Sequence, residues 1–247
     1  MLEFASAAWS DINALRDSVM ARSATSVEEA AQGFAADFRD RFASVVLARV
    51  FLVFPFSALP DEERHGVALR LDGDPRLTGK TPVLTLLGTA GRAAAWNDRR
   101  RSVGHRAIPL LSSAHVQGIP MLTKLLADLE VNLAGLDDGK PIATRRLLGG
   151  RNGAFYVPDA AAALDEEGRK IIPSQDFVSE HRVRTVFGMG GAYADGTLVA
   201  TVLFTTEVLP KDVVDRFPSV ISNFKMATED LLAQGKVFAR ALPNAGS

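Results

Sequence analysis

The last third of the chain constrains its fold most, because it contains two strand-like runs joined by a tight turn. Residues 182–193 and 197–207 are rich in β-branched and aromatic residues, and Asp195-Gly196 stands between them. An Asp-Gly pair between two such runs is a strong signal for a β-hairpin. From Pro210 to about Gln234, apolar residues recur at helical spacing. This region therefore predicts antiparallel strands followed by one long helix that packs on them.

The first 42 residues predict two amphipathic helices. Residues 7–22 carry apolar side chains at the spacing of one helical face: Trp9, Ile12, Leu15, Val19 and Met20. Ser26 with Glu29 three residues later forms a capping-box pattern, which starts a second helix that runs to about Phe42. Both helices must bury an apolar face, and a partner subunit is a natural place for it.

Further strands are predicted at residues 45–54, 82–88, 107–111 and 154–157, with a short helix from Pro60 and another over 113–129 that starts or bends at Pro120. The fold class is therefore α+β, with an antiparallel sheet of about five or six strands flanked by helices. We expect three parts: residues 1–25 as an N-terminal helix and dimer interface, 26–234 as the domain itself, and 235–247 as a loose tail.

Composition excludes several classes of protein. With no cysteine, the chain has no disulfide, thiolate metal site or cysteine nucleophile. A net charge of −1 gives no overall positive field to hold a phosphate backbone and argues against nucleic-acid binding. There is no signal peptide or membrane-spanning run, and the longest apolar stretch, 45–56, is interrupted by Arg49 and is typical of a buried strand. We expect a soluble, cytoplasmic protein that does not bind membranes.

The loop over residues 96–109 is the best candidate for a binding site. An aromatic ring, an amide, an acid and several guanidinium groups lie close together there, and such groups recognise planar or anionic ligands. The alternative is a solvated loop whose tryptophan covers the core. Gly188–Gly191 lies inside a predicted strand, where glycines indicate a bulge or the close approach of a ligand. The predicted ligand-binding residues are Trp96, Asn97, Asp98, Arg99, His105 and Met189.

Evidence for catalysis is weaker. Asp98, His105 and Ser102 or Ser112 are the ingredients of a nucleophile triad, but no GxSxG elbow occurs. The four histidines show no HExxH spacing, so no metal site is predicted. We assign no catalytic residue and no cofactor, and whether the protein is an enzyme stays open.

Two segments carry a family resemblance: residues 82–110, PVLTLLGTAGRAAAWNDRRRSVGHRAIPL, and residues 183–209, VRTVFGMGGAYADGTLVATVLFTTEVL. With the element order around them, they resemble a GAF/PAS-type sensory domain of bacterial signalling proteins such as histidine kinases. The resemblance covers roughly residues 26–234. It implies a sheet with helices on one face and a ligand pocket on the other. The chain departs from it in a longer middle, 88–172, and ends soon after the last helix without an output domain.

The resemblance implies a sensory module that binds a small molecule or a protein partner and signals through the packing of its terminal helices. A homodimer and a downstream signalling protein are the expected partners. Two other functions stay open: an adaptor or structural homodimer without a ligand, and an enzyme that uses the Asp98/His105 loop.

Overall fold

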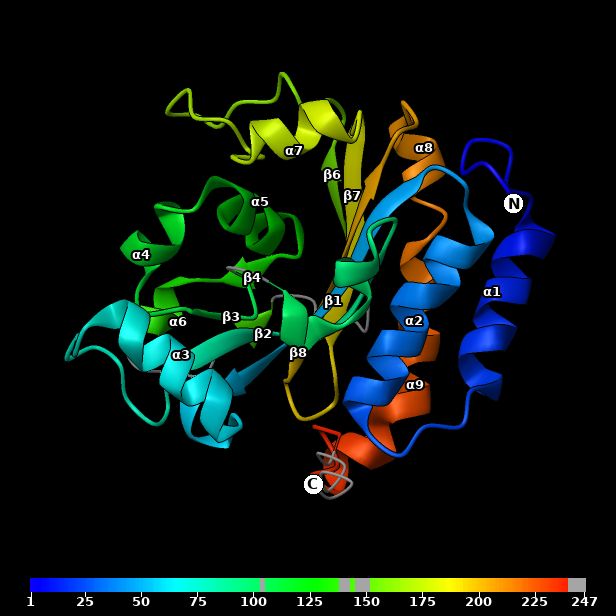
Figure 1. The fold of residues 1–247 in the computed structure, drawn as a ribbon. Coiled ribbons are helices and arrows are strands. Elements are labelled where there is room, and N and C mark those ends of the chain that lie inside the picture. Colours follow the sequence, from blue (N-terminus) through cyan, green and yellow to red (C-terminus); the bar gives the residue numbers. More distant parts are fainter. Residues whose placement is uncertain (103–104, 138–142, 145–151, 240–247) are drawn as a thin grey trace, which may run out of the picture.

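The computed structural model describes residues 1–102, 105–137, 143–144 and 152–239. Its centre is a six-stranded antiparallel sheet in the order β3-β2-β1-β8-β7-β6 (Figure 1). This confirms the predicted α+β class and its antiparallel sheet. The strands of this sheet are β1 (Val45–Pro55), β2 (Pro82–Gly91), β3 (Ala107–Pro109), β6 (Gly153–Val157), β7 (Thr185–Ala192) and β8 (Leu198–Thr205), and a separate pair is β4 (Val131–Asn132) with β5 (Ala143–Thr144).

Helices cover both faces of the sheet (Figure 1). On one face lie α1 (Trp9–Ala21), α2 (Val27–Arg41) and α9 (Pro218–Ala233); on the other lie α4 (Ser113–Gln117), α5 (Pro120–Asp128) and α7 (Gln175–Glu180). The remaining helices are α3 (Asp61–Leu71), α6 (Ala134–Asp137) and α8 (Lys211–Val214), with three short 3₁₀ turns, η1 (Phe56–Ala58), η2 (Ala94–Asn97) and η3 (Arg99–Arg101). The sheet is therefore the middle layer of three.

Prolines divide two of the predicted helices. The helix expected over 113–129 is two helices, because Pro120 begins α5 at its first turn. Ser112 is the N-cap of α4, since its hydroxyl accepts a hydrogen bond from the His115 amide at 3.1 Å. The single helix predicted from Pro210 is also wrong: α8 ends at Val214, and Pro218 starts α9. A proline lacks the N–H that would continue the preceding helix.

Alternation along the central strand β1 decides what each face of the sheet presents. Ala48, Val50 and Leu52 belong to the core under α1, α2 and α9. Leu47, Arg49 and Phe51 point to the opposite face, under α5 and α7. Successive side chains of a strand alternate between faces, so these two sets are a direct consequence of the strand period.

The core on the α2 face is aromatic and closely packed. Phe4 is fully buried, with its ring stacked on Phe42 at 4.0 Å between centroids and edge-on to Phe187 and Phe217. Gly88 of β2 lies so close to α2 that an added Cβ would meet a backbone oxygen of that helix at 2.1 Å. Little free space is left between the sheet and helices on this side.

Both ends of the described chain pack on this same unit. In α1, Ile12, Leu15 and Val19 are buried, whereas Trp9 is 63% exposed. After α9, the carbonyls of Lys236 and Val237 accept hydrogen bonds from the first amides of α2. The predicted boundaries at 25 and 235 stay predictions, and residues 240–247 of the expected loose tail lie outside the described residues. Within the described ranges, no helix is long and apolar enough to cross a membrane.

Candidate functional site

A cavity of about 300 Å³ lies between the sheet and helices α5 and α7. This volume is at the lower end of the range for small-molecule sites. Its lining is mostly apolar, and its exposed rim includes Pro173 and Ser174. The lining residues are Leu47, Arg49, Phe51, Leu84, Trp96, His105, Ile108, Ile119, Met121, Leu122, Leu125, Ile172, Pro173, Ser174, Phe177, Val202 and Phe204.

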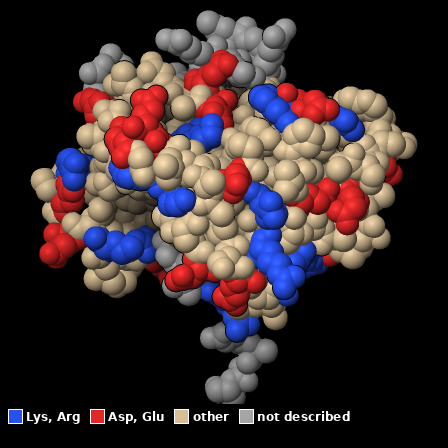
Figure 2. Space-filling view, turned by 90° about the horizontal axis from the view of Figure 1, so that it is seen from above, with Lys and Arg blue, Asp and Glu red and all other residues tan. Residues whose placement is uncertain are grey.

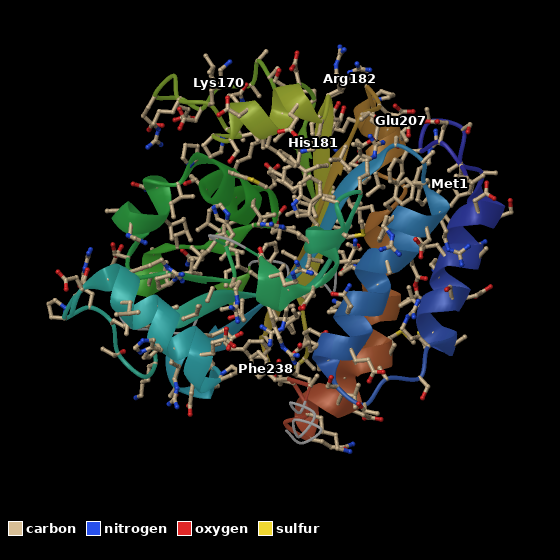
Figure 3. All side chains as sticks on the ribbon, in the orientation of Figure 1. Met1, Lys170, His181, Arg182, Glu207 and Phe238 are labelled. Atoms are coloured by element: carbon tan, nitrogen blue, oxygen red, sulfur yellow. The ribbon has the colours of Figure 1, made fainter. Side chains whose placement is uncertain are left out.

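An aromatic group forms one wall of the cavity. The Trp96 ring lies edge-on to Phe177 at 5.6 Å and to His181 at 4.9 Å between centroids. Phe177 in turn meets Phe204 of the sheet edge-on at 5.4 Å. His181 follows α7 directly, and Figure 3 shows it on the side of the sheet that α7 covers. These contacts join the η2 turn, α7 and β8 around the cavity.

Arg49 is the charged group on the cavity floor. It sits in the centre of β1, opposite Thr89 on one side and Val202 on the other. Its Nη2 donates to the Ser102 hydroxyl at 3.3 Å, while its Nε is buried and has no hydrogen-bond partner within the described residues. Burial lowers the pKa of the guanidinium from its ordinary value. An arginine in such surroundings normally has a carboxylate partner.

His105 stands at the cavity rim, with its side chain exposed on one side. The protein atoms around it, followed by the positive charges of Arg49 and Arg70, lower the pKa of its imidazole. Its ordinary pKa is about 6.5, so the ring is neutral at physiological pH. Among the described lining residues, the titratable groups are thus one cation, Arg49, and one neutral imidazole.

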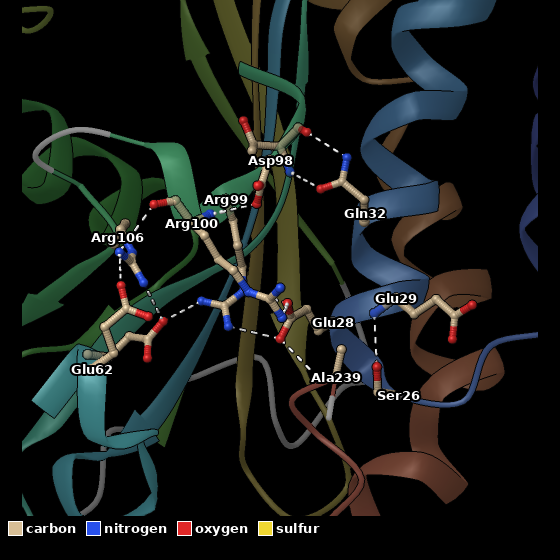
Figure 4. A network of polar contacts seen from close by, with 12 residues as sticks. Ser26, Glu28, Glu29, Gln32, Glu62, Asp98, Arg99, Arg100, Arg106 and Ala239 are labelled. Carbon is tan, nitrogen blue, oxygen red and sulfur yellow. Dashed lines mark hydrogen bonds and ion pairs between the residues drawn. The ribbon is translucent and has the colours of Figure 1, made fainter. Parts of the chain in front are cut away.

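The neighbouring Arg99 belongs to a buried ion-pair network outside the cavity lining (Figure 4). Its guanidinium contacts Glu28 of α2 at 2.9 Å and Glu63 of α3 at 2.6 Å, and all three residues are buried. Arg106 joins Glu63 at 3.0 Å and Glu62 at 2.8 Å. Burial alone would raise the pKa of Glu63, but the two arginines outweigh it and lower that pKa.

The C-terminal segment closes this network. The Ala239 amide donates to the Glu28 carboxylate at 3.0 Å. The Phe238 ring lies 5.5 Å from the guanidinium carbon of Arg99, which is a cation–π distance. In this way Arg99 connects the loop behind the cavity to both the start of α2 and the end of the described chain.

The other three predicted binding residues also lie outside the cavity lining. The Asn97 side chain accepts from Arg39 at 2.6 Å and from the Gly91 amide at 3.0 Å, so it holds the turn after β2. Asp98 caps η3 by accepting from the Arg100 amide at 2.9 Å. Met189 is fully buried in the core on the α2 face. Among the described residues, no hydrogen bond joins Asp98 to His105.

The structure therefore brings Trp96 and His105 of the predicted set to one cavity, and places Asn97, Asp98, Arg99 and Met189 elsewhere. A ligand-binding role for each of them stays a prediction. Arg49 was not among the residues predicted to bind a ligand. The sequence does contain a signal for it, because Arg49 is the one charge in an otherwise apolar strand, and alternation puts it on the same face as Leu47 and Phe51.

No metal site stands out in the described part of the chain: no group of three or more His, Asp or Glu side chains is placed there to hold a metal ion. On the face shown in Figure 2, acidic and basic side chains are interspersed. A face of mixed charge does not favour a phosphate backbone.

Comparison with known proteins yields similarity of fold only. No family model matches the chain, and no curated protein matches it. Similar solved structures include the phycocyanobilin-bound GAF domain of a cyanobacterial phytochrome, with 10% identity over 90% of this chain and 96% of that chain and a TM-score of 0.48. Another is the free methionine-R-sulfoxide reductase of Neisseria meningitidis in complex with its substrate, with 11% identity, coverages of 90% and 89%, and a TM-score of 0.44.

GAF domains are thus among the structures similar in fold, as the sequence resemblance predicted. At such identities and TM-scores, the likeness says nothing about a ligand or a reaction of this chain.

Substituting Arg99→Ala should destabilise the protein strongly. It leaves Glu28 and Glu63 buried without their common partner, and breaking a buried pair in this way costs about 3–5 kcal/mol. Arg101→Ala is the matched control, since Arg101 lies in the same turn and is exposed. It should change the free energy of unfolding by less than about 0.5 kcal/mol. Urea denaturation of both variants measures the difference, and equal effects would contradict the structural role of Arg99.

Substituting Arg49→Met should raise the pKa of His105, because a positive charge that disfavours the imidazolium is removed. NMR titration of the histidine ring measures this, with Arg101→Met as the control that leaves it unchanged. The lowered pKa in the folded state means that the unfolded chain binds the proton first as the pH falls. Stability should therefore decline below about pH 6.5 in the wild type, and less so in Arg49→Met. An unchanged His105 pKa in Arg49→Met would contradict this geometry.

Proposed function

We propose that this protein is a regulatory module that binds a small, largely apolar molecule in the cavity between the sheet and helices α5 and α7. The observation that carries the proposal is the cavity itself. The α2 face of the same sheet is filled by aromatic side chains, whereas the α5 face leaves about 300 Å³ among apolar residues with a few polar groups. A mainly apolar pocket with few convergent polar groups is the usual form of a small-molecule site.

The loop between β2 and β3 supports a regulatory role. Within about ten residues it carries Trp96 and His105, which line the cavity, and Arg99, which anchors Glu28. Glu28 also holds the Ala239 amide. A ligand that displaces this loop would therefore change the contacts that fix the end of the described chain on α2. We propose that a downstream signalling protein recognises this C-terminal segment.

A cavity-filling variant tests the binding site. Met121 lines the cavity from α5, so Met121→Trp should fill part of it. Leu69→Trp adds a ring of the same kind on α3, at a side chain that is 67% exposed and lies outside the cavity lining, and serves as the control. Calorimetry with 1-octanol and 3-phenylpropan-1-ol should show saturable binding to the wild type and to Leu69→Trp. Met121→Trp should weaken the binding of both alcohols by about tenfold or more, because the added ring occupies volume that the ligand needs and a filled site tolerates further volume poorly.

Hydrogen exchange on the same samples tests the proposed link between the cavity and the C-terminal segment. Saturation with 1-octanol should change the protection of the amides of Val27, Glu28 and Ala239, which bond between α2 and the C-terminal segment. Absence of binding to the wild type would overturn the proposed function. Binding with no change at these amides would overturn only the proposed link between ligand binding and the C-terminal segment.

We further propose that the protein is a homodimer that pairs through the outer surfaces of α1 and α9. Trp9 and Met20 of α1 and Met226 of α9 are large apolar side chains that remain 63%, 42% and 65% exposed. Light scattering should give about twice the chain mass of 26.5 kDa for the wild type, and the mass of one chain for Trp9→Glu combined with Met226→Glu. A wild type that stays monomeric at micromolar concentration would rule out this dimer.

A further inference from the structure

We propose that the ligand of this cavity is a small monocarboxylate, with its apolar body between the sheet and α5 and its carboxylate on Arg49. This inference rests on the proposed function, and adds the chemical class of the ligand. It depends on the charges around one arginine and on the shape of the space in front of it.

Arg49 lacks a counter-ion among the described residues. In these ranges of the chain, no carboxylate forms an ion pair with it, and the one hydrogen bond of its side chain is the 3.3 Å contact to Ser102. Its Nε is buried and has no hydrogen-bond partner in the described part of the chain. Burying an ionised group without a partner is costly, so an unpaired guanidinium on a cavity wall favours a ligand that brings the missing charge.

The neighbouring arginines show that this protein otherwise pairs such groups. Arg99 and Arg106, on the loop behind the cavity, contact three glutamates between them at 2.6–3.0 Å. Acidic residues are therefore close by in the fold, yet none of those described is directed to Arg49. These glutamates pair with Arg99 and Arg106, so the described cavity lining keeps the positive charge of Arg49.

The charge surrounding the cavity suits one negative charge rather than two. His105 faces Arg49 and Arg70. The Arg70 guanidinium already donates to the Ala107 carbonyl at 2.9 Å, outside the cavity lining. The imidazole is neutral at physiological pH, which leaves Arg49 as the one cation among the described residues of the lining. One guanidinium balances one carboxylate, and its planar donor fork matches the two carboxylate oxygens.

The rest of the lining selects the body of the ligand. Around Arg49 the sheet contributes Leu47, Phe51 and Phe204, and α5 contributes Leu122 and Leu125. These side chains offer contact area but no hydrogen bonds. A short aliphatic chain or a single aromatic ring fits such a space, whereas a sugar or a nucleotide would leave its polar groups unsatisfied.

Matched pairs of acids and alcohols test the inference. Calorimetry at pH 7.5 compares octanoate with 1-octanol, and 3-phenylpropanoate with 3-phenylpropan-1-ol. For the wild type and the control Arg101→Met, each acid should bind at least about tenfold more tightly than its alcohol, as expected for a charge-assisted bond. In Arg49→Met the preference for the acid should disappear, while the affinity for the alcohols stays within about threefold. Arg49→Lys should retain part of the preference, because it keeps the charge but loses the fork.

The possible failures of the two proposals are distinguishable. Equal affinity of acids and alcohols for the wild type would overturn the carboxylate and leave the proposed function standing. Binding of neither class would overturn both. An acid preference that persists in Arg49→Met would place the carboxylate elsewhere and also overturn the inference. Should Arg49→Met fail to fold, the acid-to-alcohol ratio in the wild type and in Arg49→Lys decides the question.

Discussion

The buried ion pairs of Arg99 are the interaction on which the arrangement of this protein depends. They join the loop after β2 to Glu28 at the start of α2 and to Glu63 in α3. A group of charges removed from water is stable only while every member is paired, so these three elements are held in one arrangement. The C-terminal segment is part of the same arrangement, because the Ala239 amide bonds to Glu28. The loop at the cavity and the C-terminal segment up to Ala239 therefore share one partner, Glu28.

The two faces of the sheet differ in how completely they are filled. Under α1, α2 and α9, stacked and edge-on phenylalanines occupy the space, and Gly88 lets β2 approach α2 closely. Under α5 and α7, short helices cover the sheet less completely, and a cavity remains. The closely packed face supplies stability and resists change, whereas the open face can accept a ligand at a smaller cost in packing.

The arginines of this region divide by their partners. Arg99 and Arg106 are bound to glutamates of α2 and α3, and they fix the fold. Arg49 lies on the central strand without a carboxylate among the described residues, and it faces the cavity. An arginine side chain thus has a structural role where a glutamate lies next to it. Where no described glutamate does, as at Arg49, it is open to a ligand.

The sequence by itself determined the local elements and the fold class. The Asp195-Gly196 turn, the Ser26 cap and the apolar periodicities gave the hairpin, α2 and most strands correctly, because these signals act between residues close in the chain. It also predicted a binding role for the loop that carries Trp96 and His105. Pro218 is a further local signal for a helix start, and the single helix predicted from Pro210 did not take it into account.

Only the tertiary structure decided which charges meet. Glu28, Glu63 and Arg99 are up to 71 positions apart in the chain, and nothing in their local patterns marks them as partners. The same holds for Arg49: the described acids near it in the fold pair with Arg99 and Arg106, and no local pattern in the sequence indicates this. Pairing over such separations follows from how sheet and helices pack, and local periodicity does not encode it.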